Sequence, residues 1–223
     1  ERYPFGNTEI DAVAEASRLL ENAAGVSRHG PGQAVLTDDV VSTYAQVALV
    51  TGGFFDVLGV EAILGRTLSR LDEKAGAENV IVISSGLWQR RWGGSRDVIG
   101  RRVTLGEQPF TIVGVIPPDL DYPSGVEIWR TTNSVPSFEP FAEAARREVN
   151  LIGRLRPGVT IEQASSEMRA LTRRLEADAP RHALRGLIPV ISGFTDEVVG
   201  GIRLLLLVLY RAVWLLLLIS VAN

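Results

Sequence analysis

The sequence contains no cysteine, and Lys74 is the single lysine among its 23 basic residues. Without cysteine, the chain can form neither disulfide bonds nor thiolate metal sites, and it has no thiol nucleophile. Histidine is scarce as well, because only His29 and His182 are present. Both lie in predicted turn or loop segments and show no metal-ligand spacing. We therefore expect neither a metal site nor a bound cofactor.

Motifs that carry common enzyme chemistry are missing too. The nucleophile pattern GxSxG is absent, and so is the phosphate-binding pattern GxxxxGK[ST]. Ser84 and Ser85 precede a predicted helix, where a serine most often caps the helix. We therefore expect no catalytic residue, no enzymatic activity and no ATP binding by this chain itself.

The sequence also lacks the excess of basic residues that nucleic-acid-binding proteins use to contact phosphates. Residues before position 202 carry 21 basic and all 26 acidic side chains, a net charge of −5. The stretch "WQRRW" is basic and aromatic, but Trp88 and Trp92 lie one helical turn apart and are predicted to pack in a core. We expect no nucleic-acid partner. Three acidic pairs lie at predicted turns and are expected to be solvated: Asp38–Asp39, Asp72–Glu73 and Asp196–Glu197.

The clearest predicted helix begins after Thr160, with Gln163 at the reciprocal capping position, and ends at Pro180. Arginines occupy its other faces. One apolar seam follows a spacing of three and four residues, through Ile161, Ala164, Met168, Leu171 and Leu175.

Other segments show strand, helix or loop character. A first helix is expected from Asn7 or Thr8, with Ile10, Val13, Ser17 and Leu20 on one face. Segment 119–141 is predicted to be a loop. A short helix or turn is predicted at 51–60 and a short helix at 85–92. Strands are predicted at 41–50, 79–84, 101–105, 109–117, 148–155 and 187–194. The strand at 79–84 is expected to be buried, and those at 101–105 and 109–117 are expected to form a hairpin.

This order of elements predicts an α+β protein with two lobes. Residues 1–52 and 148–200 are expected to form a discontinuous, porter-like α/β lobe. Residues 53–147 are expected to form an inserted, β-rich lobe with a short helix. Residues 201–223 are expected to begin a transmembrane helix.

A long apolar run, "IRLLLLVLYRAVWLLLLISVA", occupies residues 202–222. Its length matches the roughly 20 residues that a membrane-spanning helix needs. The alternative is a helix buried in the core of a soluble domain, but no other part of the chain is predicted to be large enough to wrap it. The first residues, in contrast, resemble neither a signal peptide nor a membrane span.

The position of Arg211 favours one membrane register. If 202–222 were the span, Arg211 would lie at its centre, at a cost of about 2.5–3.5 kcal/mol. A bilayer that begins near Ala212 avoids this cost and continues beyond Asn223. Tyr210, Arg211 and Trp214 are then expected at the outer membrane interface, where aromatic rings and snorkelling arginines are favoured.

Four sequence blocks, in order, resemble the MacB-like periplasmic core domain of FtsX-type ABC transporter permeases. They are "VTGGFFDVLGVEAILGRTLSRLDE" (50–73), the block 80–123 with "SSGLWQRRWGG", "DVIG" and "IVGVIP", the block 151–180 with "GRLRPGVT", and the final "LLLISVAN". Arg211 and Trp214 depart from the family's small apolar residues in the last helix. Structural roles are expected for three glycines in these blocks. Gly52 and Gly53 permit a sharp exit from a strand, and Gly114 suggests a bulge or a close backbone approach.

The resemblance implies an extracytoplasmic domain, on the periplasmic side of the bacterial cytoplasmic membrane. It implies a permease that works as a homodimer or paired half with a cytoplasmic ABC ATPase, fused or separate. A periplasmic adaptor or outer-membrane partner is also implied as possible, in addition to the lipid bilayer. ATP hydrolysis would then be coupled to export or to mechanical movement outside the membrane.

Two other classes of function remain open from the sequence. The first is a membrane-anchored extracytoplasmic binding module without transport activity. It would have a single span, whereas a permease should have one span before residue 1 and more after Asn223. The second, an anchored hydrolase, has no visible nucleophile and base to support it.

Overall fold

The computed structural model describes residues 7–27, 32–38, 41–74, 76–134 and 149–178, together with 191, 193, 208–211 and 214. The fold is mixed α/β, in agreement with the predicted class at this coarse level. The helices are α1 (Asn7–Ala16), α2 (Phe54–Leu58), α3 (Ser85–Trp92) and α5 (Ile161–Asp178), with short 3-10 turns η1 (Arg70–Glu73), η2 (Arg96–Val98) and η3 (Thr132–Ser134). The strands are β1 (Leu20–Ser27), β2 (Gly32–Thr37), β3 (Ser42–Val50), β4 (Leu64–Gly65), β5 (Val80–Ser84), β6 (Arg102–Leu105), β7 (Gln108–Ile116), β8 (Ile128–Thr131) and β9 (Val149–Leu155).

Six of the strands form a ladder that closes on itself. Their order is β2-β6-β7-β5-β8-β3, and β3 pairs back onto β2 from Gly32↔Val47 to Thr37↔Ser42. We call this closed ladder the barrel. β1 continues the sheet from the end of β3 through the pair Val26↔Val50, and β9 runs antiparallel along β1.

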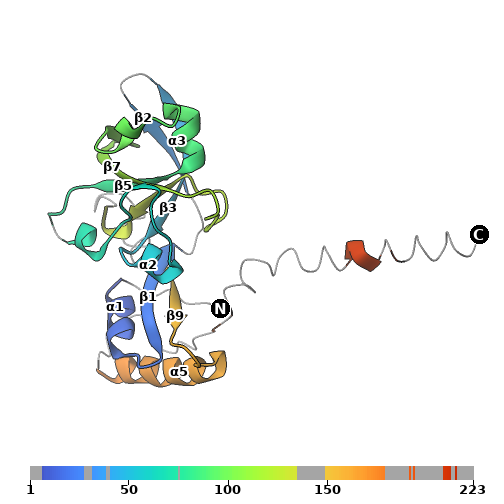
Figure 1. Cartoon of the computed structure of the whole chain (residues 1–223). Coiled ribbons are helices and arrows are strands. Elements are labelled where there is room, and N and C mark those ends of the chain that lie inside the picture. Colours follow the sequence, from blue (N-terminus) through green and yellow to red (C-terminus); the bar gives the residue numbers. More distant parts are fainter. Residues whose placement is uncertain are drawn as a thin grey trace, which may run out of the picture.

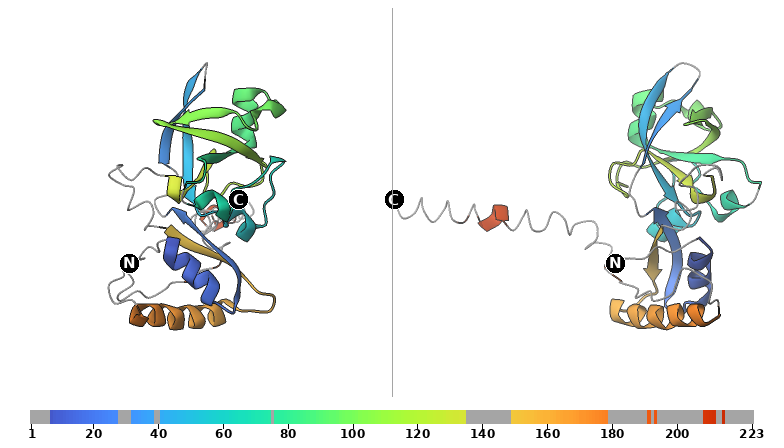
Figure 2. Two further views of the ribbon diagram at one scale, coloured as in Figure 1. Left: turned by 90° about the vertical axis from the view of Figure 1, so that its left-hand side faces the viewer. Right: turned by 180° about the vertical axis from the view of Figure 1, so that it is seen from behind.

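The elements separate along the long axis of the molecule. In Figure 1, α1, β1, β9 and α5 lie at one end, the barrel strands and α3 lie at the other, and α2 lies between them. Both views of Figure 2 show the β2–β3 hairpin projecting at the end opposite α5. β3 belongs to the barrel along its whole length, because it pairs with β2 up to Val47 and with β8 from Val47 to Val50, and its last residue also pairs with β1.

The interior of the barrel is filled by one cluster of buried side chains. β5 shows the alternation that produces it, because Ile81 and Ile83 are fully buried in this cluster while Val80 and Val82 are buried on the opposite face. Every barrel strand contributes to the interior: Leu36, Ala45, Val47, Ile81, Ile83, Val103, Leu105, Phe110, Ile112, Val115 and Ile128. β5 is thus buried on both faces, as its continuous apolar sequence predicted.

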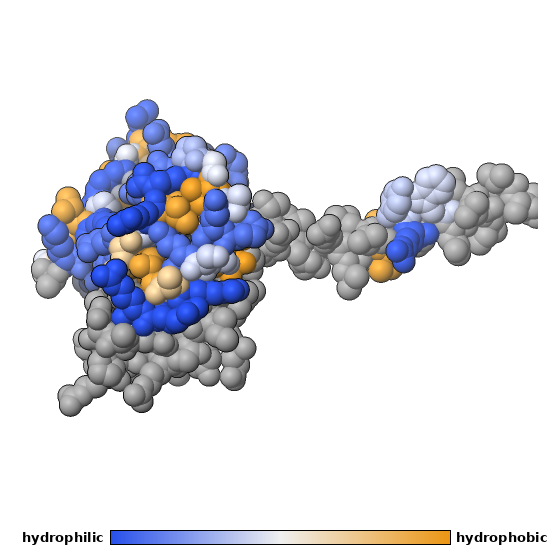
Figure 3. All heavy atoms as spheres, turned by 90° about the horizontal axis from the view of Figure 1, so that it is seen from below, coloured by the Kyte–Doolittle hydropathy of each residue, from blue (hydrophilic) through white to orange (hydrophobic). Residues whose placement is uncertain are grey.

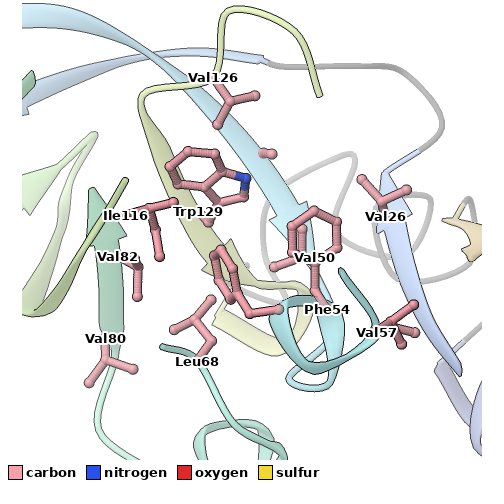
Figure 4. Packing of buried hydrophobic residues seen from close by; sticks show 13 residues of the cluster. Val26, Val50, Phe54, Val57, Leu68, Val80, Val82, Ile116, Val126 and Trp129 are labelled. Atoms are coloured by element: carbon pink, nitrogen blue, oxygen red, sulfur yellow. The ribbon is translucent and has the colours of Figure 1, made fainter. Parts of the chain in front are cut away.

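A second cluster, which we call the α2 core, covers the outer face of the barrel next to α2. Phe54 and Phe55 of α2 pack edge to face, and the Phe55 ring meets Trp129 of β8 at 5.9 Å between ring centroids. Figure 4 shows Trp129 and Phe54 surrounded by aliphatic side chains from several strands. The cluster comprises Ala24, Val26, Ala48, Val50, Phe54, Phe55, Val57, Leu68, Val80, Val82, Ile116, Val126 and Trp129.

A third, smaller cluster joins α1, β1 and α5 through Val13, Leu20, Ala23 and Met168. The predicted seam of α5 is confirmed at Ala164 and Met168, both of which are buried. Ile161 is 40% exposed, whereas Thr172 is buried. Thr172 was not expected in the seam, but its hydroxyl donates to the carbonyl oxygen of Met168 at 2.9 Å, so burial leaves it hydrogen-bonded.

Several helix ends were predicted correctly from local signals in the sequence. The amide of Leu87 donates to Ser84 Oγ at 3.1 Å, and Gly93 ends α3 in the left-handed conformation. The predicted capping box before α5 is also confirmed. The amide of Thr160 donates to Gln163 Oε1 at 2.9 Å, and the amide of Gln163 donates to Thr160 Oγ1 at 3.3 Å.

Four strands were not predicted, one of them the two-residue β4. β1 begins at Leu20, which was assigned to the face of the first helix, and β2 lies in a segment taken as a lead-in to β3. The prediction of a loop over 119–141 is wrong at β8, which lies between β3 and β5 with Ile128 and Trp129 fully buried. Each of these strands is short or rich in alanine, glycine and polar residues, so tertiary pairing decides its conformation.

The predicted lobe boundary at residue 53 does not coincide with a break in the sheet. β2 and β3 precede it, yet they pair with β6 and β8 beyond it. The lobe boundaries themselves stay a prediction. The predicted helix stop at Pro180 lies outside the described residues, as does the predicted strand 187–194 apart from Ile191 and Gly193, which are not in a strand.

Truncation of Phe55 is expected to destabilise the whole fold. Its side chain is fully buried against Trp129, so the variant Phe55→Ala should lower the free energy of unfolding by about 3–5 kcal/mol, because a cavity replaces the ring. Chemical denaturation measures this change. Leu71→Ala is the matched control, because that side chain is 65% exposed and its loss should change stability by less than about 0.5 kcal/mol.

Gly114 is expected to resist substitution even by alanine. It follows a bulge in β7, where the pairing with β5 shifts register, and an added Cβ would lie 1.9 Å from the carbonyl oxygen of Arg66. Gly114→Ala should therefore lower the unfolding midpoint in a thermal melt. Gly86→Ala in α3 meets nothing closer than 3.5 Å and should leave the midpoint unchanged or raise it. Equal effects of the two variants would contradict the predicted close approach.

Candidate functional site

Serine and histidine residues were considered from the sequence as candidates for catalysis or metal binding, and one of them, Ser84, has a structural role. Ser84 caps α3, as expected, and its hydroxyl is occupied by the amide of Leu87. His29 and His182 lie outside the described residues. Within the ranges that the structure describes, no group of three or more histidine, cysteine, aspartate or glutamate side chains could hold a metal ion.

The basic and aromatic stretch of α3 packs as predicted. Trp88 and Trp92 lie against the barrel interior, and Trp88 Nε1 donates to the carbonyl oxygen of Ser95 at 2.8 Å. Gln89 and Arg90 are exposed. The aromatic side chains of this helix are therefore occupied by packing.

The prediction that the acidic pairs are solvated is wrong for three described residues. Asp38 forms an ion pair with Arg91 at 3.1 Å, and both side chains are less than 10% exposed. Asp72 and Glu73 are partly buried in η1. The pattern Ser69-x-x-Asp72 could have revealed the second case, since it is the signature of a capping box. Asp39, Asp196 and Glu197 lie outside the described residues.

Asp72 organises the start of η1. Its carboxylate accepts hydrogen bonds from the amide and hydroxyl of Ser69 and forms a two-pronged ion pair with Arg66, at 2.7 and 2.8 Å. Burial alone would raise the pKa of Asp72. The bonds from Arg66 and Ser69 outweigh burial, so the pKa of Asp72 lies below its usual value.

Glu73, the next residue, has the opposite shift. Burial raises the pKa of its carboxyl, and the hydrogen bond from the amide of Gly52 only partly offsets this effect. The backbone comes very close here, because a Cβ on Gly52 would lie 2.3 Å from the carbonyl oxygen of Ser69. Gly52 therefore provides the sharp exit from β3 that was predicted for it, and the same exit brings β3 into contact with η1.

Two further polar contacts tie the β1–β9 ribbon to α2 and to the end of β3. Thr51 and Gly25 are joined twice: the Gly25 amide donates to Thr51 Oγ1 at 2.8 Å, and the Thr51 amide donates to the Gly25 carbonyl oxygen at 2.9 Å. Arg154 of β9 donates through Nε to the carbonyl oxygen of Val57, at the end of α2, at 2.9 Å. A guanidinium at a helix C-terminus is electrostatically favourable. We call these contacts, together with the contact of Gly52 with η1, the junction.

A polar cleft of about 260 Å³ opens beside the junction, between α1, β1, α2 and η1. Glu15, Glu21 and Asp56 bring negative charge to it, and Arg70 brings the positive charge. The lining is thus mostly charged and polar, with Ala14 and Ala23 as its apolar side chains, which is unlike the usual small-molecule pocket.

The predicted membrane-interface residues lie on a short described part of the C-terminal segment. Residues 208–211 and Trp214 are helical, and the Tyr210 and Trp214 rings meet edge to face at 6.2 Å between centroids. Tyr210 is 62% exposed, Trp214 is 52% exposed, and Arg211 is also exposed. Figure 3 shows hydrophobic, intermediate and strongly hydrophilic atoms side by side on this segment, away from the main body.

Most of the apolar run 202–222 lies outside the described residues. Among the described residues, no helix combines the length and the apolar character that a membrane crossing requires. The structure therefore brings Tyr210 and Trp214 together next to Arg211, and the membrane register of these residues stays a prediction.

Comparisons with solved structures agree on the fold. The periplasmic region of MacB from Actinobacillus actinomycetemcomitans is 14% identical, with a TM-score of 0.59 over 80% of this chain and 76% of that one. A domain of a putative permease from Porphyromonas gingivalis is 22% identical, with a TM-score of 0.56 over 78% and 71%. The extracellular domain of the noncanonic ABC-type transporter YknZ from Gram-positive bacteria is 16% identical, with a TM-score of 0.56 over 79% and 85%.

No curated protein matches the sequence significantly. The sequence model of one family, described as the MacB-like periplasmic core domain, matches residues 2–171. This match covers two of the four blocks from which the resemblance was predicted, 50–73 and 80–123, and the larger part of a third, 151–180. The chain therefore belongs to the family of MacB-like periplasmic core domains.

Proposed function

We propose that the chain is the extracytoplasmic, non-enzymatic domain of an ABC transporter permease, and that it couples ATP hydrolysis in the cytoplasm to movement outside the membrane. Membership of the MacB-like family is the observation that carries this proposal. The proposal includes a cytoplasmic ABC ATPase and a second permease subunit as partners, and a place for the domain on the periplasmic side of the cytoplasmic membrane.

The distribution of contacts supports a mechanical role. The barrel has its own fully buried interior, and α1, β1, β9 and α5 share a separate cluster at the other end. The junction and the α2 core are the connections between these two regions. We infer that they correspond to two lobes, an inserted β-rich lobe and a porter-like lobe, and that a pull on the chain ends reaches the barrel through the junction.

The C-terminal residues support attachment to a bilayer. An exposed Tyr–Trp pair beside an arginine, within a long apolar run, fits the membrane interface better than it fits water. In the proposed register the bilayer begins near Ala212. Residues 204–209 then lie above the hydrocarbon, and Trp214 lies just within its boundary.

The membrane register is testable because the chain has no cysteine, so a single introduced one can be labelled without background. An environment-sensitive fluorophore on Trp214→Cys should shift to the blue on addition of phospholipid vesicles and become protected from aqueous iodide. The same label on Val208→Cys should stay accessible, because it lies about 9 Å higher along a helix. Tyr44→Cys on β3 is the control, and its label should respond to vesicles in neither measurement.

Two results would contradict this register. Protection at position 208 that equals or exceeds protection at 214 would favour a span that contains Arg211. Full iodide access at 214 in the presence of vesicles would remove the membrane attachment at these residues.

The mechanical role predicts a change of distance between the two ends of the domain. Spin labels on Tyr44→Cys in β3 and Arg173→Cys in α5 occupy exposed positions at opposite ends. In the full-length permease with its ATPase in nanodiscs, the distribution of distances between them should differ between the nucleotide-free and ATP-bound states. A label pair within the barrel, Tyr44→Cys and Glu107→Cys, should show no difference. Identical distributions for the first pair would exclude internal movement of this domain.

The anchored binding module predicts a different result in the same system. A module without transport activity would have one span and would copurify with no ATPase. Addition of ATP would then leave both label pairs unchanged, whereas addition of a ligand could change them.

A further inference from the structure

The junction contains a partly buried carboxyl group, that of Glu73. Glu73 is the last residue of η1, and its side chain reaches the turn between β3 and α2, where the amide of Gly52 donates to it. Its own backbone carbonyl oxygen accepts a hydrogen bond from Asn133 Nδ2 of η3 at 2.8 Å. Glu73 is therefore held from two sides, by the exit of β3 and by η3.

The close approach of the two backbones leaves this carboxyl little freedom. A Cβ on Gly52 would lie 2.3 Å from the Ser69 carbonyl oxygen and 2.6 Å from the Arg70 nitrogen, so the turn and η1 touch directly. The capping box of Ser69 and Asp72 fixes the conformation of η1. The Glu73 side chain cannot leave the contact unless η1 moves as well.

One oxygen of this carboxyl, Oε1, is buried and accepts no hydrogen bond from the described part of the chain. A carboxylate can only accept hydrogen bonds, and a buried acceptor without a donor is costly. A protonated carboxyl is neutral, and its O–H group can donate a hydrogen bond. Burial of this oxygen therefore favours the protonated form of Glu73.

The charged groups around Glu73 are unequal in number. Asp11 of α1 and Asp72 of η1 both disfavour a negative charge on Glu73, and Arg70 of η1 favours it. Arg66 neutralises Asp72 through its two-pronged ion pair. Asp11 is thus the negative charge that faces Glu73 from a different element, and Arg70 opposes its effect.

We propose that Glu73 is a proton-binding site that fastens η1 to the β3–α2 turn when it is protonated and loosens this contact when it is ionised. The contact lies between η1 and the end of β3, so proton uptake would stiffen this part of the junction. This proposal concerns the isolated chain and does not rest on its role in transport.

The sign of the pH dependence follows from the raised pKa of Glu73. The folded chain holds this proton more tightly than the unfolded chain, so Glu73 destabilises the fold as pH rises through the two pKa values, and this cost is absent in acid. Glutamine at this position imitates the protonated carboxyl. Asp72 has the opposite sign, because its lowered pKa gives stability at neutral pH that is lost in acid.

The test uses the 223-residue chain in detergent or nanodiscs. In thermal melts, Glu73→Gln should unfold at a higher temperature than the wild type at about pH 7.5, and the two should converge as the pH approaches about 4.5. Glu107→Gln, in the exposed turn between β6 and β7, is the matched control and should follow the wild type at both pH values. Asp72→Asn should show the reverse trend, with its largest loss at neutral pH.

A direct titration makes the test independent of how well the variants fold. Carbon-13 NMR of the side-chain carboxyls should give a midpoint for Glu73 in the wild-type chain that lies above the value of a glutamate in an unfolded peptide, about 4.3. Asp11→Asn should lower the midpoint of Glu73, because it removes the facing negative charge. The proposal is overturned if Glu73 titrates at or below the unfolded-peptide value, or if Glu73→Gln differs from the wild type by the same amount at both pH values.

Discussion

The packing of α2 against the barrel is the constraint on which the rest of the structure depends. Phe54 and Phe55 are fully buried, and the α2 core draws side chains from β1, β3, β5, β7 and β8 as well as from α2. Because β3, β5, β7 and β8 also fill the barrel with their other face, each of these four strands must present apolar groups on both sides. Loss of the α2 core would therefore expose one face of the barrel and detach the β1–β9 ribbon at once.

Local features of the sequence predicted much of this fold. The helix caps at Ser84 and Thr160, the hairpin of β6 and β7, the bulge near Gly114 and the buried strand β5 are all confirmed. Each depends on a few adjacent residues whose backbone preferences are strong. β8 was missed because "VEIW" is short and follows a run of turn residues, and its central position depends on pairing with β3 and β5, which are distant in sequence.

The candidate site was less accessible to sequence reasoning. Asp72 and Glu73 are neighbours with the same charge, yet their surroundings shift their pKa values in opposite directions. Arg66 and Ser69 stabilise one charge, whereas burial next to Gly52 opposes the other. The spacing Ser69-x-x-Asp72 could have indicated the hydrogen bonds that stabilise the Asp72 charge, but no spacing in the sequence encodes the close approach of η1 to the exit of β3 beside Glu73. The membrane-interface residues were named from residue type and from their place in the apolar run, and their position in a membrane stays a prediction.

The closure of the six-stranded ladder has a consequence for where another chain could add a strand. An open sheet presents unpaired amide and carbonyl groups at its outer strands, and these can recruit a foreign strand. β2 is bonded to β3 from Gly32 to Thr37 and, on its other side, to β6 at Leu36 and Thr37. Closure therefore shields the end of β2 next to the hairpin turn, and a neighbouring molecule that touches this end must recognise side chains.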